Sequence, residues 1–137
     1  DPANHQAMTD VRSEKIAGIA KSYGPLTLEQ GEGEEGDLLV VGWGSTWGPI
    51  SRAVSNMRAA GHKVGQLHLR HIWPLHGDLG SLLQRWRRIA VPEMNAGQLV
   101  TLLRATYLVD AVAVTKVSGR PFKVGELEAR LGELLKE

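Results

Sequence analysis

Residues 38–50 have the sequence Leu-Leu-Val-Val-Gly-Trp-Gly-Ser-Thr-Trp-Gly-Pro-Ile. Leu38–Val41 are four consecutive aliphatic residues with no polar alternation, and such a run predicts a strand that is covered on both faces. Gly42 and Gly44 allow the backbone to turn sharply, and the Ser-Thr pair that follows can cap a helix. The stretch therefore predicts a strand, a glycine turn and a helix, which is where α/β proteins place their ligands.

The remaining apolar patterns alternate between helix and strand. A helix with a thin apolar stripe is expected at residues 4–23, and a half-buried edge strand at Leu26–Leu28. Further strands are expected at 63–72, 88–92 and 109–117, and further helices at 49–60, 79–86, 99–108 and 124–136. This order predicts an open, mainly parallel sheet with helices on both faces, and 137 residues suit one such domain.

The composition excludes several classes of function. The net charge of +1 gives no electrostatic case for nucleic acid or an acidic membrane. The absence of cysteine excludes disulfides, thiol nucleophiles and cysteine-ligated iron–sulfur clusters in this chain. With no membrane-length apolar run and no visible signal peptide, we expect a soluble, cytoplasmic protein. The chain begins Asp-Pro without an initiator Met, so we expect a fragment of a longer polypeptide.

Ligand chemistry is expected at the carboxyl ends of the predicted strands. The turn over residues 42–48 is close to a dinucleotide-binding fingerprint, but its third glycine comes one place late and no acidic residue ends the next strand. Arg70 at that strand end could meet a 2′-phosphate instead. The favoured interpretation is a tight turn with close packing, and free amides at the start of the next helix leave a generic anion open.

Other residues at these strand ends are candidates for a partner surface. Glu93 could act as a base, although a carboxylate that bonds backbone amides is the commoner case, and Trp43, Trp47 and Trp73 suit a protein interface. No histidine spacing matches a known zinc pattern, so no metal ligand is predicted. We also predict no catalytic residue and no cofactor-binding residue. The candidate interface or anion-binding residues are Gly42, Gly44, Ser45, Thr46, Trp47, Arg70, His71, Glu93 and Asn95.

Four motifs occur in a distinctive order: Leu-Val-Val-Gly-Trp-Gly-Ser-Thr-Trp-Gly at 39–48, His-Leu-Arg-His-Ile-Trp-Pro-Leu at 68–75, Val-Pro-Glu-Met-Asn-Ala-Gly-Gln-Leu at 91–99 and Lys-Val-Ser-Gly-Arg-Pro-Phe at 116–122. Together they resemble the carboxyl-terminal domain of the alpha subunit of 2-oxoacid:ferredoxin oxidoreductases, especially the 2-oxoglutarate type. Residues 1–5 and 12–15 resemble the segment that leaves the preceding thiamine-related domain. The resemblance implies a helical linker over residues 1–24 and a single domain over residues 25–137.

The resemblance implies a fold similar to the carboxyl-terminal domain of transketolases. This is a three-layer α/β/α fold with a five-stranded, mostly parallel mixed sheet of order 1-3-2-4-5. Its first strand, near Leu26–Leu28, would be antiparallel, and Leu38–Val41 would be central.

The whole enzyme of such a family decarboxylates a 2-oxoacid on thiamine diphosphate with magnesium. It passes electrons through iron–sulfur chemistry to ferredoxin and forms an acyl-coenzyme A. This chain lacks the family's Gly-Asp-Gly…Asn diphosphate motif, since Gly77-Asp78 is followed by Leu79, and the family carries that motif in a partner beta subunit.

The resemblance thus implies an assembly domain that is not catalytic alone and binds no cofactor alone. Its partners would be the remaining alpha-subunit domains and a thiamine-binding beta subunit. The alternative is a small-anion or nucleotide-binding module that uses the Gly42–Thr46 loop.

Overall fold

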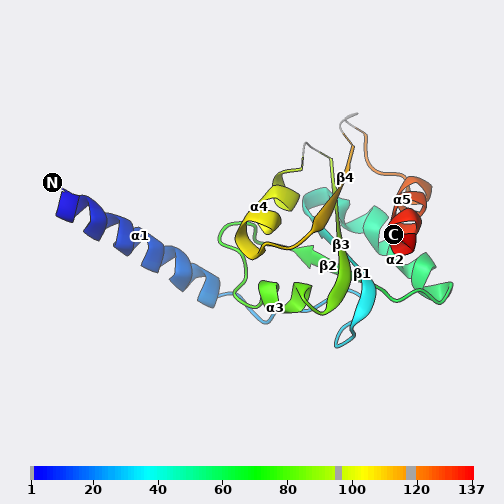
Figure 1. Ribbon diagram of the computed structural model, residues 1–137, viewed down its shortest axis with the longest axis horizontal. Helices are drawn as coiled ribbons and strands as arrows, with labels where there is room; N and C mark the ends of the chain where they lie inside the picture. Colours follow the sequence, from blue (N-terminus) through cyan, green and yellow to red (C-terminus); the bar gives the residue numbers. More distant parts are fainter. Residues whose placement is uncertain (1, 95–96, 117–119) are drawn as a thin grey trace.

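The computed structural model describes residues 2–94, 97–116 and 120–137. Figure 1 shows a central sheet between two helical layers and a long first helix that projects away from them. The elements in chain order are α1 (Pro2–Lys21), β1 (Gly36–Trp43), the 3₁₀ turn η1 (Gly44–Thr46), α2 (Trp47–Ala59), β2 (Val64–Leu69), α3 (Leu79–Leu83), β3 (Trp86–Glu93), α4 (Gln98–Tyr107), β4 (Ala111–Thr115) and α5 (Val124–Lys136).

The sheet has four strands in the order β2-β1-β3-β4, and every pair is parallel. The run Leu38–Val41 lies in β1, at the centre of the sheet, and is fully buried. Leu38 and Val40 face a core built with α2 and α5, whereas Leu39 and Val41 face a core built with α3 and α4. Burial on both faces explains why this strand carries no polar alternation, as the sequence predicted.

The prediction of five strands with an antiparallel first strand is wrong for the described residues. The segment after Leu26–Leu28 forms a single antiparallel bridge, Gln30 to Gln66, along the outer edge of β2. The amide of Leu28 is hydrogen-bonded to the Glu32 carboxylate, so it is not available for a strand ladder. Gly31 then turns the chain away with a φ of +88°. The segment thus occupies the predicted edge position and direction without becoming a strand.

Several predicted boundaries also need correction. Trp86, predicted to end α3, is buried as the first residue of β3. Leu108, predicted on the apolar face of α4, is 89% exposed and ends that helix with a φ of +55°. The strand predicted over 63–72 ends at Leu69, so His71 lies in the loop that follows.

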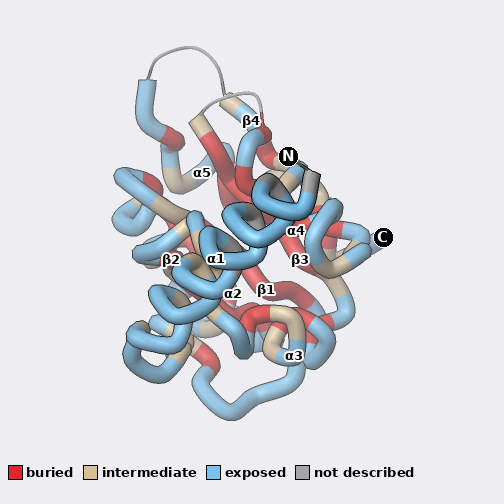
Figure 2. Tube along the Cα trace, turned by 90° about the vertical axis from the view of Figure 1, so that its left-hand side faces the viewer, coloured by how far each residue is buried: buried red, intermediate tan, exposed pale blue. Residues whose placement is uncertain are grey.

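Helix α1 stands apart from the two cores. Figure 2 shows α1 almost entirely in the colour of exposed residues, whereas the buried residues gather on the central strands. Met8, Val11 and Ile19 are each about half exposed on it. Among the described residues, no helix combines the length and the apolar character that crossing a membrane requires.

Candidate functional site

The glycine turn at the end of β1 is built by close packing. A side chain at Gly42 would place its Cβ 2.5 Å from Ile50 Cδ1 and 2.8 Å from Thr46 Oγ1, so only glycine fits without a shift. Thr46 is buried, and its Oγ1 donates to the Trp43 carbonyl at 2.8 Å and accepts from the Trp43 amide at 3.3 Å. Gly44 has a φ of +62° and faces open space. Within the Gly42–Thr46 loop, Gly44 and Ser45 are the exposed residues.

Glu93 is a buried cap at the end of β3, with 1% exposure. Its Oε1 accepts hydrogen bonds from the Leu99 amide at 2.7 Å and from Trp43 Nε1 at 3.0 Å, and its Oε2 accepts one from the Val100 amide at 3.2 Å. A carboxylate at the amino terminus of α4 satisfies amides that have no partner within the helix and complements the helix dipole. Both oxygens are thus engaged in holding β1, β3 and α4 together, and a proton donor in solvent has no access to them.

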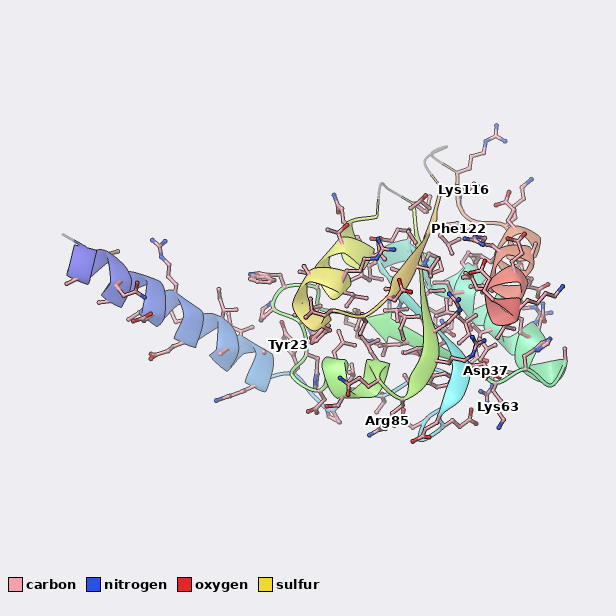
Figure 3. The ribbon with its side chains drawn as sticks, in the orientation of Figure 1. Tyr23, Asp37, Lys63, Arg85, Lys116 and Phe122 are labelled. Carbon is pink, nitrogen blue, oxygen red and sulfur yellow. The ribbon has the colours of Figure 1, made fainter. Side chains whose placement is uncertain are left out.

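Arg70 and His71 contact the connector that follows α1. Arg70 Nη2 lies 3.6 Å from Glu29 Oε1, and the His71 ring stacks on Tyr23 with a centroid distance of 4.0 Å. Tyr23 also donates to the Pro74 carbonyl at 2.9 Å. Figure 3 shows Tyr23 where α1 joins the body of the domain. These two predicted site residues are therefore part of the attachment of α1.

His76 strengthens the same attachment. The Asp78 amide donates to its Nδ1 at 3.0 Å, so in the neutral ring the proton lies on Nε2. That Nε2 can donate to the Gly24 carbonyl, which lies 2.9 Å away. The sequence predicted a surface or hydrogen-bonded histidine at 76, and the folded chain shows that it is hydrogen-bonded and which two partners it has.

His68 lies beside this connector at the carboxyl end of β2, opposite Gly42. Burial lowers the pKa of its ring, the Glu29 charge opposes that effect, and the Arg70 charge adds to it. Its Nδ1 is buried and has no hydrogen-bond partner within the described part of the chain. His68 is therefore expected to be neutral at physiological pH.

The large exposed apolar side chains at the strand ends are tryptophans. Trp47 is 45% exposed and Trp73 is 69% exposed, while Trp43 is half-buried against Glu93. Asn95, which was predicted as a helix cap and site residue, lies outside the described residues, and Gly97 precedes α4. Within residues 2–94, 97–116 and 120–137, no group of three histidine or carboxylate side chains could hold a metal ion.

The fold is that of a small parallel α/β domain, in which Glu93 is a buried cap and Trp47 and Trp73 are exposed. The protein family described as pyruvate:ferredoxin oxidoreductase core domain II matches residues 36–127. The chain belongs to this family, and the resemblance to alpha subunits of the 2-oxoglutarate type is confirmed by its relatives.

Among curated relatives, the chain is 41% identical over 127 residues to the 2-oxoglutarate oxidoreductase subunit KorA of Mycobacterium tuberculosis, covering 93% of this chain and 19% of the relative. It is 29% identical over 112 residues to the 2-oxoglutarate synthase subunit KorA of Methanocaldococcus jannaschii, covering 80% of this chain and 30% of the relative. The chain thus spans less than a third of the length of either relative.

Among solved structures, a 2-oxoglutarate:ferredoxin oxidoreductase from Magnetococcus marinus, with 2-oxoglutarate, coenzyme A and succinyl-CoA bound, superposes with a TM-score of 0.89 at 30% identity. The match covers 98% of this chain and 24% of that chain. The alpha chain of a probable 2-oxoacid ferredoxin oxidoreductase from Thermoplasma acidophilum has a TM-score of 0.54 at 23% identity, covering 79% of this chain and 95% of that chain, which supports the fold alone.

Proposed function

We propose that this chain is the assembly domain of the alpha subunit of a thiamine diphosphate-dependent 2-oxoglutarate:ferredoxin oxidoreductase, and that it is not catalytic alone. In this proposal residues 1–24 link it to a preceding domain and residues 25–137 form the domain itself. The relatives whose names include 2-oxoglutarate support the substrate. A thiamine-binding beta subunit and ferredoxin are the proposed partners of the whole enzyme.

The observation that carries the proposal is helix α1. It exposes Met8, Val11 and Ile19 and projects from the domain (Figure 1). Because α1 has 20 residues, a superposition that covers 98% of the chain with a TM-score of 0.89 must include most of it. A helix that packs against nothing would not be expected to point in the same direction in two different proteins. A shared direction supports a helix that is seated on another part of a longer polypeptide.

The strand ends support the same proposal. Glu93 and Thr46 are engaged in hydrogen bonds within the chain, whereas Trp47, Trp73 and Arg70 are exposed. Tryptophan and arginine are the residues that contribute most to protein interfaces when they become buried. These strand ends therefore suit contact with another protein, and they do not form an arrangement of acid, base and nucleophile.

The cofactors of the proposed enzyme do not fit the side chains of this domain. The sequence has no cysteine for an iron–sulfur cluster, and the described residues offer no carboxylate cluster for a magnesium diphosphate unit. We therefore derive no reaction step here, and we propose that thiamine diphosphate, magnesium and the cluster are held by other parts of the enzyme.

The proposal is tested by co-purification with the thiamine-binding subunit. We expect Trp47→Ala and Arg70→Ala, made in the polypeptide that carries this domain, to weaken recovery of that subunit several-fold. The matched change Arg85→Ala, at an exposed residue between α3 and β3, should leave it unchanged. Normal assembly after deletion of the domain, or 2-oxoglutarate-dependent reduction of ferredoxin by the isolated chain, would refute the proposal.

The Gly42–Thr46 loop supports a second candidate, a small-anion site. Helix α2 begins directly after η1 without a side-chain cap on its amides, and Gly44 and Ser45 are exposed beside it. The coenzyme A in the Magnetococcus marinus structure carries phosphates of the kind that such amides could bind. Titration of the chain with coenzyme A and with inorganic phosphate should raise its melting temperature if the site exists, and no change would exclude it.

A further inference from the structure

A buried pair of glutamine side chains joins the connector after α1 to β2. Gln66 lies on β2 with 1% exposure, and Gln30 lies half-buried in the segment that bridges to it. Gln30 Nε2 donates to Gln66 Oε1 at 2.9 Å, and the Gln66 backbone amide donates to the Gln30 carbonyl at 3.0 Å. A side-chain amide in an apolar core is costly unless its polar atoms find partners, so the further partners of this pair matter.

The other hydrogen bonds of the pair reach the first turn of α2. Gln30 Nε2 also donates to the Ser51 carbonyl at 3.0 Å, and Gln66 Nε2 donates to the Trp47 carbonyl at 3.5 Å. These carbonyls lie one helical turn apart, on the side of α2 that faces β2. Within an α-helix both already accept bonds from amides four residues further on, so the helix can form without the pair. The glutamines therefore determine where the first turn of α2 lies.

The apolar contacts of this part of α2 constrain its position less sharply. Ile50, Ala53 and Val54 are fully buried between α2 and the sheet. Burial of apolar surface is non-directional, whereas a hydrogen bond restricts both a distance and an angle. Two donors that meet successive turns of one helix thus fix its start, both along and around the helix axis.

A separate anchor holds the other end of α2. Arg58 lies in the last turn of the helix, at the opposite end from Trp47. Its Nη1 donates to the Val64 carbonyl at 2.8 Å and lies 2.9 Å from Glu34 Oε2. Polar contacts therefore hold α2 at both ends, and the glutamine pair acts at the end that carries Trp47.

We propose that Gln30 and Gln66 are positioning residues that hold Trp47 in place for contact with the partner subunit. Trp47 is the first residue of α2, and its side chain is 45% exposed, so fixing its carbonyl fixes where the indole projects. This inference rests on the proposed function, in which Trp47 contacts the thiamine-binding subunit. Because Gln30 belongs to the connector, the pair also sets Trp47 relative to the attachment of α1.

NMR of the 137-residue chain tests the positioning directly. The indole N–H signal of Trp47 is identified by its loss in Trp47→Phe. We expect Gln30→Met combined with Gln66→Met to shift or broaden that signal, because methionine fills a similar space but donates no hydrogen bond. Replacing both partners of a buried hydrogen bond by apolar groups of similar shape costs little stability, so the double variant should fold. Arg58→Met, which removes the far anchor of α2, should leave the Trp47 signal unchanged.

Partner binding separates positioning from a general loss of stability. In the polypeptide that carries this domain, the double glutamine variant should raise the dissociation constant for the thiamine-binding subunit by roughly threefold to tenfold. Arg58→Met should not raise it. In a Trp47→Ala background the glutamine substitutions should add no further loss, because a positioning residue acts only through the residue that it positions.

The two measurements distinguish failure of this inference from failure of the proposed function. An unmoved Trp47 signal in the folded double variant, or an equal loss of binding with and without Trp47, would overturn the positioning role. If Trp47→Ala itself leaves binding intact, the proposed interface is wrong, and the indole signal alone decides whether the pair positions Trp47. Should the double variant not fold, Gln30→Met at the half-buried member removes the Ser51 bond and carries the same expectations.

Discussion

The indole Nε1 of Trp43 donates to the Glu93 carboxylate at 3.0 Å, although 50 residues separate the two in sequence. This bond joins the ends of two neighbouring parallel strands, β1 and β3, at the edge where α/β domains place their sites. The same carboxylate caps α4. The most promising acidic candidate in the sequence therefore holds the strand ends in place.

Glu93→Gln should destabilise the domain by about 1–3 kcal/mol, because an amide nitrogen would face one of the three donors and the charge at α4 would be lost. Chemical denaturation should measure this loss as a lower free energy of unfolding, with an unchanged m-value. Glu35→Gln, at an exposed carboxylate, is the control and should change stability little. An equal effect of the two substitutions would contradict the buried-cap assignment.

Gly42→Ala should cost about 1–3 kcal/mol, since its Cβ would overlap Ile50 and Thr46 in the tight turn. Gly48→Ala, in the first turn of α2 with nothing within 4 Å of its Cβ, should be neutral or stabilising by up to about 1 kcal/mol. Thermal unfolding of the two variants makes the comparison. If Gly42→Ala were as stable as the wild type, the close-packed turn would be disproved.

The His68 ring should titrate below its ordinary pKa, because burial disfavours the charged form. Glu29→Gln should lower this pKa further, and Arg70→Gln should raise it, according to the sign of each neighbouring charge. NMR titration of the ring protons measures both shifts.

The same shift makes stability depend on pH. Since the folded-state pKa lies below the unfolded value, the unfolded chain binds more protons in the interval between them, and stability falls as the pH drops through that interval. His68→Gln should flatten this part of the stability–pH curve. An unaltered slope in His68→Gln would exclude this contribution.

Tyr23→Phe should weaken the attachment of α1 by about 1 kcal/mol, because it removes the hydrogen bond to Pro74 and keeps the ring on His71. Tyr23→Ala removes both contacts and should accelerate amide exchange over residues 22–30 further. Tyr107→Phe, at a tyrosine that packs on the α3–α4 core, is the control and should leave these amides unaffected. Equal exchange in all three variants would show that the Tyr23 contacts do not hold the connector.

The candidate site was only partly predictable from the residues. Trp47 and Trp73 were expected at exposed strand ends and are exposed there. The sequence favoured a Glu93 carboxylate that bonds backbone amides, and the Leu99 and Val100 amides confirm it. The side-chain partners of Glu93 and His71 could not be predicted, because Trp43 and Tyr23 are distant in sequence and no local pattern links the pairs.

The sequence alone determined the alternation of helices and strands and the burial of Leu38–Val41 on both faces, because periodicity and unbroken hydrophobicity are local properties that burial selects. Tertiary structure alone decided that the segment at 26–30 forms one bridge instead of a fifth strand, and that the Glu93 carboxylate accepts hydrogen bonds from the first amides of α4. Those outcomes depend on which backbone groups find partners across the fold. Hydrogen bonds between distant segments leave no periodic pattern in the sequence.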